Sequence, residues 1–76
     1  MSWKDAVTEP DEVAVFQALD EPYTWRTIGG ISRQTGLSEE RVHAILAKYN
    51  LSLTRLAETP SISGSPLVGL IENVGA

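Results

Sequence analysis

The sequence contains no cysteine. Disulfide bonds, thiolate metal ligands and a cysteine nucleophile are therefore excluded. A chain of 76 residues is near the lower size limit for a hydrophobic core that is stable without cross-links. We therefore expect the fold to depend on its core alone or on a partner, either another protein or a second copy in a homodimer.

Long apolar runs are also missing. No stretch approaches the roughly 20 apolar residues that span a bilayer. The N-terminal residues 1–5 lack the basic start and apolar run of a signal peptide. We therefore expect a soluble cytoplasmic protein with no membrane contact.

Residues that would form a catalytic or cofactor site are scarce. His43 is the only histidine, and no carboxylate lies three or four positions after it, so no metal site is expected. Gly29 and Gly30 lack the spacing and the following lysine of a phosphate-binding loop. We expect no cofactor and no small-molecule substrate.

The carboxylates give no catalytic pair either. Several are sequence neighbours, which a helix points in different directions, so shared acid-base chemistry is not indicated. Solvation and favourable charge at helix starts explain these pairs, which are Asp11/Glu12, Asp20/Glu21 and Glu39/Glu40. The expectation is a protein that is not an enzyme.

Positive charge is scarce overall: the formal net charge is -4. Such a balance argues against nucleic acid, because phosphate binding is driven by basic side chains that release counterions. The charges are unevenly placed, however. Residues 24–57 contain five basic and two acidic residues, whereas the remainder contains one lysine and eight carboxylates. Any contact with nucleic acid is therefore expected in the middle of the chain.

The first amphipathic helix is predicted over 10–21. Val13, Phe16 and Leu19 recur at helical spacing, acidic residues favour the helix start, and Pro22 ends the helix. Trp3 precedes this helix, and it either covers the core or docks elsewhere.

A second helix is predicted to follow Trp25 and to end near Thr35. Gly29 and Gly30 lie inside it, and each costs about 1 kcal/mol relative to alanine. We expect close approach of a neighbouring backbone, or of the Trp25 ring, to offset this cost.

A third helix is predicted over 39–49. Gly36 tolerates the left-handed geometry that ends the preceding helix, and Ser38 is a suitable N-cap. The apolar stripe follows the i, i+3, i+4, i+7 pattern and consists of Val42, Ile45, Leu46 and Tyr49.

The remaining sequence predicts a hairpin. Residues 51–57 alternate well enough for a strand, 58–66 are rich in Ser, Thr, Pro and Gly, and 67–71 are again apolar. The predicted fold class is therefore mainly α with a small β-hairpin (α+β): a three-helix bundle followed by two strands.

The run from Thr27 to Leu46 resembles the helix-turn-helix of winged-helix proteins. Two short helices that cross steeply need a small residue at the crossing, a glycine in the turn and apolar anchors under the second helix. The matching positions are Ser32, Gly36, Leu37, Val42 and Ile45. The resemblance implies one winged-helix domain over 1–76, with a core at about 10–72, a helix-turn-helix at about 24–49 and a wing at about 51–72.

What that family implies is a third helix in the major groove of double-stranded DNA, and a role in transcription regulation. On this reading the groove is contacted by Ser38, Arg41, His43, Ala44 and Lys48. The residues that contact phosphates are Arg26, Arg33 and Arg55.

A second interpretation keeps the scaffold and changes the ligand. Glu40 lies near the middle of the outward face of the third helix and would repel phosphate. The loop of the wing, 58–66, contains no basic residue. The alternative function is a protein-protein interaction module whose contact patch is the Ala44 and Ala47 surface or the wing loop.

Overall fold

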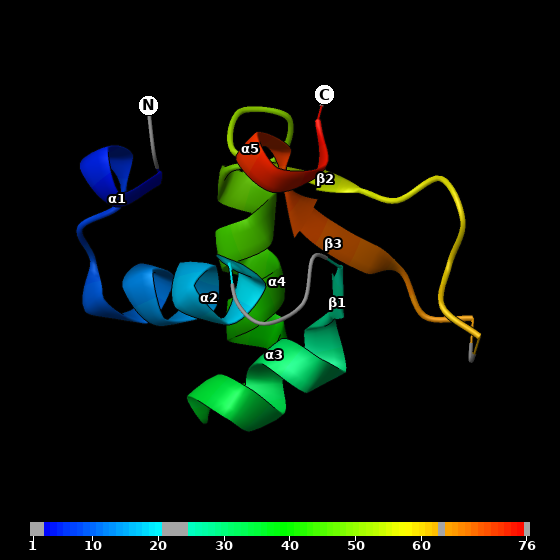
Figure 1. The fold of residues 1–76 in the computed structure, drawn as a ribbon. Coiled ribbons are helices and arrows are strands. Elements are labelled where there is room, and N and C mark those ends of the chain that lie inside the picture. Colours follow the sequence, from blue (N-terminus) through cyan, green and yellow to red (C-terminus); the bar gives the residue numbers. More distant parts are fainter. Residues whose placement is uncertain (1–2, 21–24, 63, 76) are drawn as a thin grey trace.

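The structure, a computed structural model, describes residues 3–20, 25–62 and 64–75 (Figure 1). These residues form a mixed α+β fold, which confirms the predicted class at that level. The elements are α1 (Trp3–Ala6), α2 (Pro10–Asp20), β1 (Arg26–Thr27), α3 (Ile28–Thr35), α4 (Glu39–Lys48), β2 (Thr54–Leu56), β3 (Leu67–Leu70) and α5 (Ile71–Val74).

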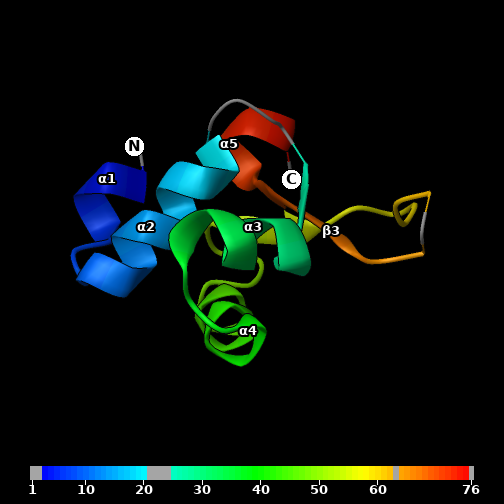
Figure 2. The ribbon, with the colours of Figure 1, turned by 90° about the horizontal axis from the view of Figure 1, so that it is seen from below.

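The three predicted helices are present as α2, α3 and α4. Pro22, which was expected to end the first of them, lies outside the described residues. Gly36 has φ 80° and ends α3, and the Ser38 hydroxyl accepts a hydrogen bond from the Arg41 N–H at 3.1 Å, so both predicted caps are confirmed. Helix α3 packs against both α2 and α4, and Figure 2 shows α4 nearly end-on at one edge of the molecule.

The sheet differs from the expected two-stranded wing, because over the described residues it has three antiparallel strands in the order β1-β3-β2. Arg26 and Thr27, which were expected within the second helix, pair instead with Val68 and Leu67. The reason is local: Thr27 is the N-cap of α3, with an extended backbone, and its hydroxyl accepts from the Gly30 N–H at 3.0 Å. Arg26 and Thr27 therefore lie outside the helix and can pair as a strand.

The hairpin that β2 and β3 form is confirmed, but its first strand begins later than expected. Residues 51–53 form a turn in which Leu51 has φ 67°, and pairing starts at Thr54, opposite Leu70. Figures 1 and 2 show the loop between the strands extending away from the helices.

The core joins the helices to one face of the sheet. Phe16 is fully buried at its centre, and the rings of Trp3 and Tyr49 pack against it with centroid distances of 5.5 and 5.1 Å. The buried apolar side chains are Trp3, Val7, Val15, Phe16, Ala18, Leu19, Ile31, Val42, Ile45, Leu46, Val68 and Leu70. Trp3 therefore covers the core, one of its two expected positions.

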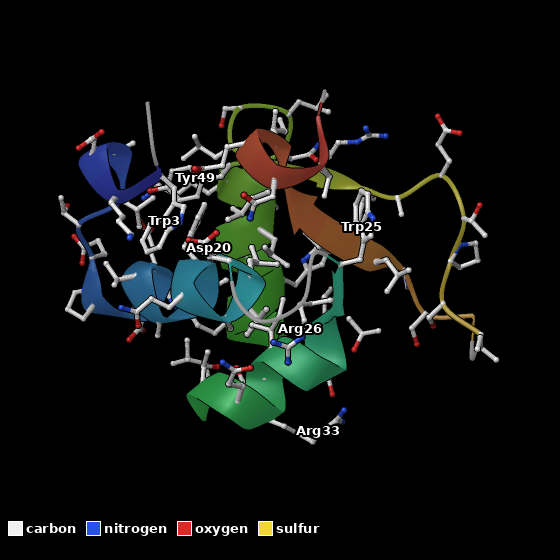
Figure 3. The ribbon with its side chains drawn as sticks, in the orientation of Figure 1. Trp3, Asp20, Trp25, Arg26, Arg33 and Tyr49 are labelled. Atoms are coloured by element: carbon white, nitrogen blue, oxygen red, sulfur yellow. The ribbon has the colours of Figure 1, made fainter. Side chains whose placement is uncertain are left out.

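Two short helices, α1 and α5, were not predicted from the sequence. Both are hydrogen-bonded to Asp20 at the C-terminal end of α2. Asp20 lies near Trp3 (Figure 3) and accepts a hydrogen bond from its indole N–H at 3.2 Å. It accepts another from the Asn73 amide at 2.9 Å. The Asn73 and Trp3 bonds lower the pKa of this carboxyl, against the opposing effect of burial. The Trp3 backbone N–H also donates to Glu72 at 2.8 Å. Both short helices are thereby fixed to the same place.

The two glycines of α3 have different surroundings. A methyl group on Gly30 would lie 3.2 Å from Thr27 Oγ1 and 3.3 Å from Arg26 Nη2, so the close neighbours are these side chains and not the Trp25 ring or another helix. A methyl group on Gly29 would meet only Arg33 Nη1, at 3.5 Å, which is ordinary contact.

We expect Gly29→Ala to raise the free energy of unfolding by about 0.4 to 1 kcal/mol, because alanine loses less backbone entropy and finds room. Gly30→Ala is the matched control, and it should give no gain, since the new methyl displaces the hydroxyl that caps the helix. Urea unfolding followed by circular dichroism measures both. Equal stabilisation by the two alanines would contradict the prediction.

Candidate interaction groove

Helix α4 carries four of the five residues that were expected to contact the major groove, and its basic side chains lie toward α2. Arg41 Nε is 3.4 Å from Asp11 Oδ2, and Lys48 Nζ is 2.7 Å from Glu12 Oε2. Lys48 also lies 5.3 Å from the centre of the Tyr49 ring. Both cations expected in the groove of DNA are therefore paired with carboxylates of this chain.

Glu12 was expected to be solvated at a helix start, and that expectation is wrong. The residue is 4% exposed, and besides the Lys48 ammonium it accepts a hydrogen bond from the Tyr49 hydroxyl at 2.5 Å. The Lys48 bond, followed by the Tyr49 bond, lowers the pKa of Glu12 although burial opposes this. The same carboxylate raises the pKa of Lys48 and of Tyr49.

Two of the expected phosphate contacts are engaged within the protein. Arg26 is half-buried and donates to the Ala18 carbonyl at 2.9 Å and to Gln34 Oε1 at 2.7 Å, which joins α2 to α3. Arg55 lies 5.9 Å from the centre of the Trp25 ring and donates to the Gly75 carbonyl at 3.1 Å.

Arg33 is the exception among the expected contacts. It is exposed, and its side chain has no ion pair or hydrogen bond within the part of the chain that the structure describes. Figure 3 shows it extending from α3 away from the body of the molecule. The side chains of Glu39 and Glu40 are exposed and equally unpaired among the described residues.

Beside α4 the surface forms two hollows. The larger, about 620 Å³, lies among the first turns of α3 and α4 and the hairpin loop, and is lined by Thr27, Ile28, Gly29, Arg33, Glu39, Glu40, His43, Ser65 and Pro66. The smaller, about 210 Å³, lies between α4 and the strands, and is lined by Ile28, His43, Leu46, Ala47, Asn50, Thr54, Arg55, Leu56 and Val68. Because Ile28 and His43 line both, we treat the two hollows as one groove, the α4 groove.

The α4 groove has an acidic part and an apolar part. Glu39 and Glu40, with Arg33 as the one lysine or arginine among the described lining residues, lie in the larger hollow, whereas Ala47 and the 55% exposed Leu56 lie in the smaller one. The sequence predicted Ala47 as a contact residue but not Leu56. Alternation of side chains along a strand that begins at Thr54 places Leu56 on the same face as Thr54. That inference needs the start of the strand, which the sequence analysis placed too early.

The expected site residues are thus divided. His43 and Arg33 line the groove, Arg41 and Lys48 lie on the α2 side, and Arg26 is bonded between helices. The others are Ser38, which caps α4, Ala44, which is exposed on it, and Arg55, which lines the smaller hollow while its guanidinium is near Trp25.

Comparison with protein-family models, with curated proteins and with solved structures gave no match. Function is therefore argued from the geometry. Over the described ranges, none of the helices has the length and apolar content needed to cross a membrane. The same residues contain no group of three or more His, Asp or Glu side chains placed to hold a metal ion.

Proposed function

We propose that this chain is a protein-interaction module on a winged-helix scaffold, and that its α4 groove binds a segment of another protein. The scaffold is supported by the order of the elements: three packed helices, with Gly36 and Ser38 between the last two, followed by the β2-β3 hairpin. The strand β1 adds to β3 of this hairpin and leaves the order unchanged.

The distribution of charge on α4 is the observation that carries the proposal. Its two cations are paired with Asp11 and Glu12 on the α2 side, whereas Glu39 and Glu40, in the groove, have no ion pair with any residue that the structure describes. DNA binding is disfavoured by this arrangement, since its affinity comes largely from lysine and arginine side chains that are available to neutralise phosphates. The groove instead favours a segment that carries basic side chains.

The apolar part of the groove indicates what else the segment carries. Ala47 is a small, exposed side chain in the lining, and more than half of the surface of Leu56 is exposed to solvent. Full burial of a leucine side chain contributes about 1.5 to 3 kcal/mol, enough to make Leu56 an anchor of an interface. The partner segment is therefore one with an apolar side chain near lysine or arginine.

A selection on the purified chain tests this proposal. We expect a phage-displayed library of random peptides, about twelve residues long, to yield sequences enriched in aliphatic and basic residues. Leu56→Asp should weaken the selected peptides by at least about tenfold, because it places a charge in the apolar hollow. Ile62→Asp is the matched control, since Ile62 is fully exposed and is not a lining residue of either hollow.

A titration with short duplex DNA at low salt provides the opposing outcome. Localised amide shifts at Arg33, His43 and Ala44 with micromolar affinity would favour the DNA interpretation and overturn the proposal. Failure of the selection to enrich any peptide that depends on Leu56 would also overturn it.

A further inference from the structure

We infer that the partner segment binds as an extended strand that pairs with the open edge of β2 at Leu56; this rests on the proposed function. Strand β2 lies at one edge of the sheet, with β3 on its inner side. An unpaired edge offers a row of backbone N–H and C=O groups to which another chain can pair.

The hydrogen bonds on either side of Leu56 fix the direction of its backbone groups. The Ala57 N–H donates to the Leu67 carbonyl at 2.8 Å, and the Ile71 N–H donates to the Leu53 carbonyl at 2.9 Å. In an antiparallel ladder these bonded positions alternate with positions that point away from the partner strand. Leu56 lies opposite Val68 at such a position, so its N–H and C=O face the open edge.

The edge is open at Leu56 and closed just before it. At Thr54, the carbonyl accepts from the Leu51 N–H at 2.8 Å, and the N–H donates to the Tyr49 carbonyl at 3.2 Å. The turn after α4 thus covers the edge at Thr54. Within the described residues, no such turn bonds to the N–H or C=O of Leu56. An added strand would therefore pair with β2 directly after the turn.

The side chains at this edge define the chemistry of the added strand. Leu56 and buried Thr54 are two positions apart on one face of β2, and both line the α4 groove. Alternate side chains of an added strand point to that same face, where an apolar residue would contact Leu56. Glu58, Glu39 and Glu40 are exposed and have no ion pair within the described part of the chain, so basic residues complement them.

A second copy of this chain fits the edge less well. Each copy has a net charge of -4, so pairing of β2 with β2 would bring two acidic chains together, and their like charges repel. The occupant that we infer is therefore a basic, alternating segment of a different protein.

The test uses the whole 15N-labelled chain and a synthetic peptide in which valine alternates with threonine and which ends in two lysines. We expect amide exchange at Leu56 to slow by at least about tenfold at saturating peptide, because its N–H gains a partner. Amide shifts at His43 and Ala47 report occupation of the groove. A peptide with the same side chains but N-methylated valines should lose about tenfold in affinity, because it lacks the donors that pair with the edge.

The outcomes separate this inference from the function on which it rests. Shifts at His43 and Ala47 without slower exchange at Leu56, or equal affinity of the N-methylated peptide, would overturn strand pairing and leave a groove-binding module. No change at any of these positions would count against both. Slower exchange at Leu56 that depends on protein concentration alone would assign the edge to a second copy and overturn the inference.

Discussion

Replacing Trp3 by alanine is expected to lower the free energy of unfolding by about 3 to 5 kcal/mol. The side chain is 2% exposed, its ring packs on Phe16, and its indole N–H donates to Asp20. The substitution therefore leaves a cavity beside the centre of the core and removes one of the two bonds that the structure gives the Asp20 carboxyl. In a small domain such a loss is a large part of the total stability.

Two variants serve as controls, and the first separates the contribution of the ring from that of the hydrogen bond. Trp3→Phe keeps an aromatic ring on Phe16 and should cost less than the alanine variant. Trp25→Ala removes a half-exposed indole and should also cost less. Urea unfolding of each variant gives the values. An alanine variant at position 3 within about 1 kcal/mol of the wild type would mean that α1 does not stabilise the core.

Helices α3 and α4 and the turn between them could be predicted because their signals are local. A left-handed glycine, a serine cap three residues before the N–H that it accepts, and a stripe with helical spacing all lie within 36–49. Each of these features has its physical cause within one or two turns of helix. The structure therefore agrees with the sequence there.

The elements that were missed depend on distant partners. Strand β1 has two residues, too few to show a period, and it exists because Val68 and Leu67 lie beside it. Helix α1 has four residues, about one turn, and its position depends on Asp20 and Glu72. A pattern within a window of sequence contains no information on such pairs.

The same limit explains the candidate site. The spacing of Arg41 and Lys48 predicts correctly that they share one side of α4, but their carboxylate partners on α2 are 30 and 36 positions away. Whether a cation is available to a ligand depends on those partners. The net charge of the middle segment could not show that both were already paired.

The second large effect is expected at Glu12. Glu12→Ala should lower the free energy of unfolding by about 3 kcal/mol, because it removes a buried acceptor from both Lys48 and Tyr49 and leaves the Tyr49 hydroxyl without its partner. Glu12→Gln is the matched control. It keeps an oxygen that can accept from the hydroxyl, so its cost should be smaller, and equal losses for the two variants would contradict this account.

The pH dependence of the free energy of unfolding distinguishes the contribution of the negative charge of Glu12 from that of the shape of its side chain. In the folded protein the pKa of this carboxyl lies below its ordinary value of 4.5, so the stability that its ionisation contributes is fully present above 4.5 and is lost as pH falls through the folded pKa. Glutamine has no such contribution. The difference in unfolding free energy between the wild type and Glu12→Gln should therefore shrink steadily once the pH falls below about 4.5. A difference that stays constant over that range would mean that the carboxylate is no better stabilised in the fold than in water, and that Lys48 is not held by its charge. Lys48 would then be available to an anionic ligand, and the charge argument against DNA would lose one of its two pairs.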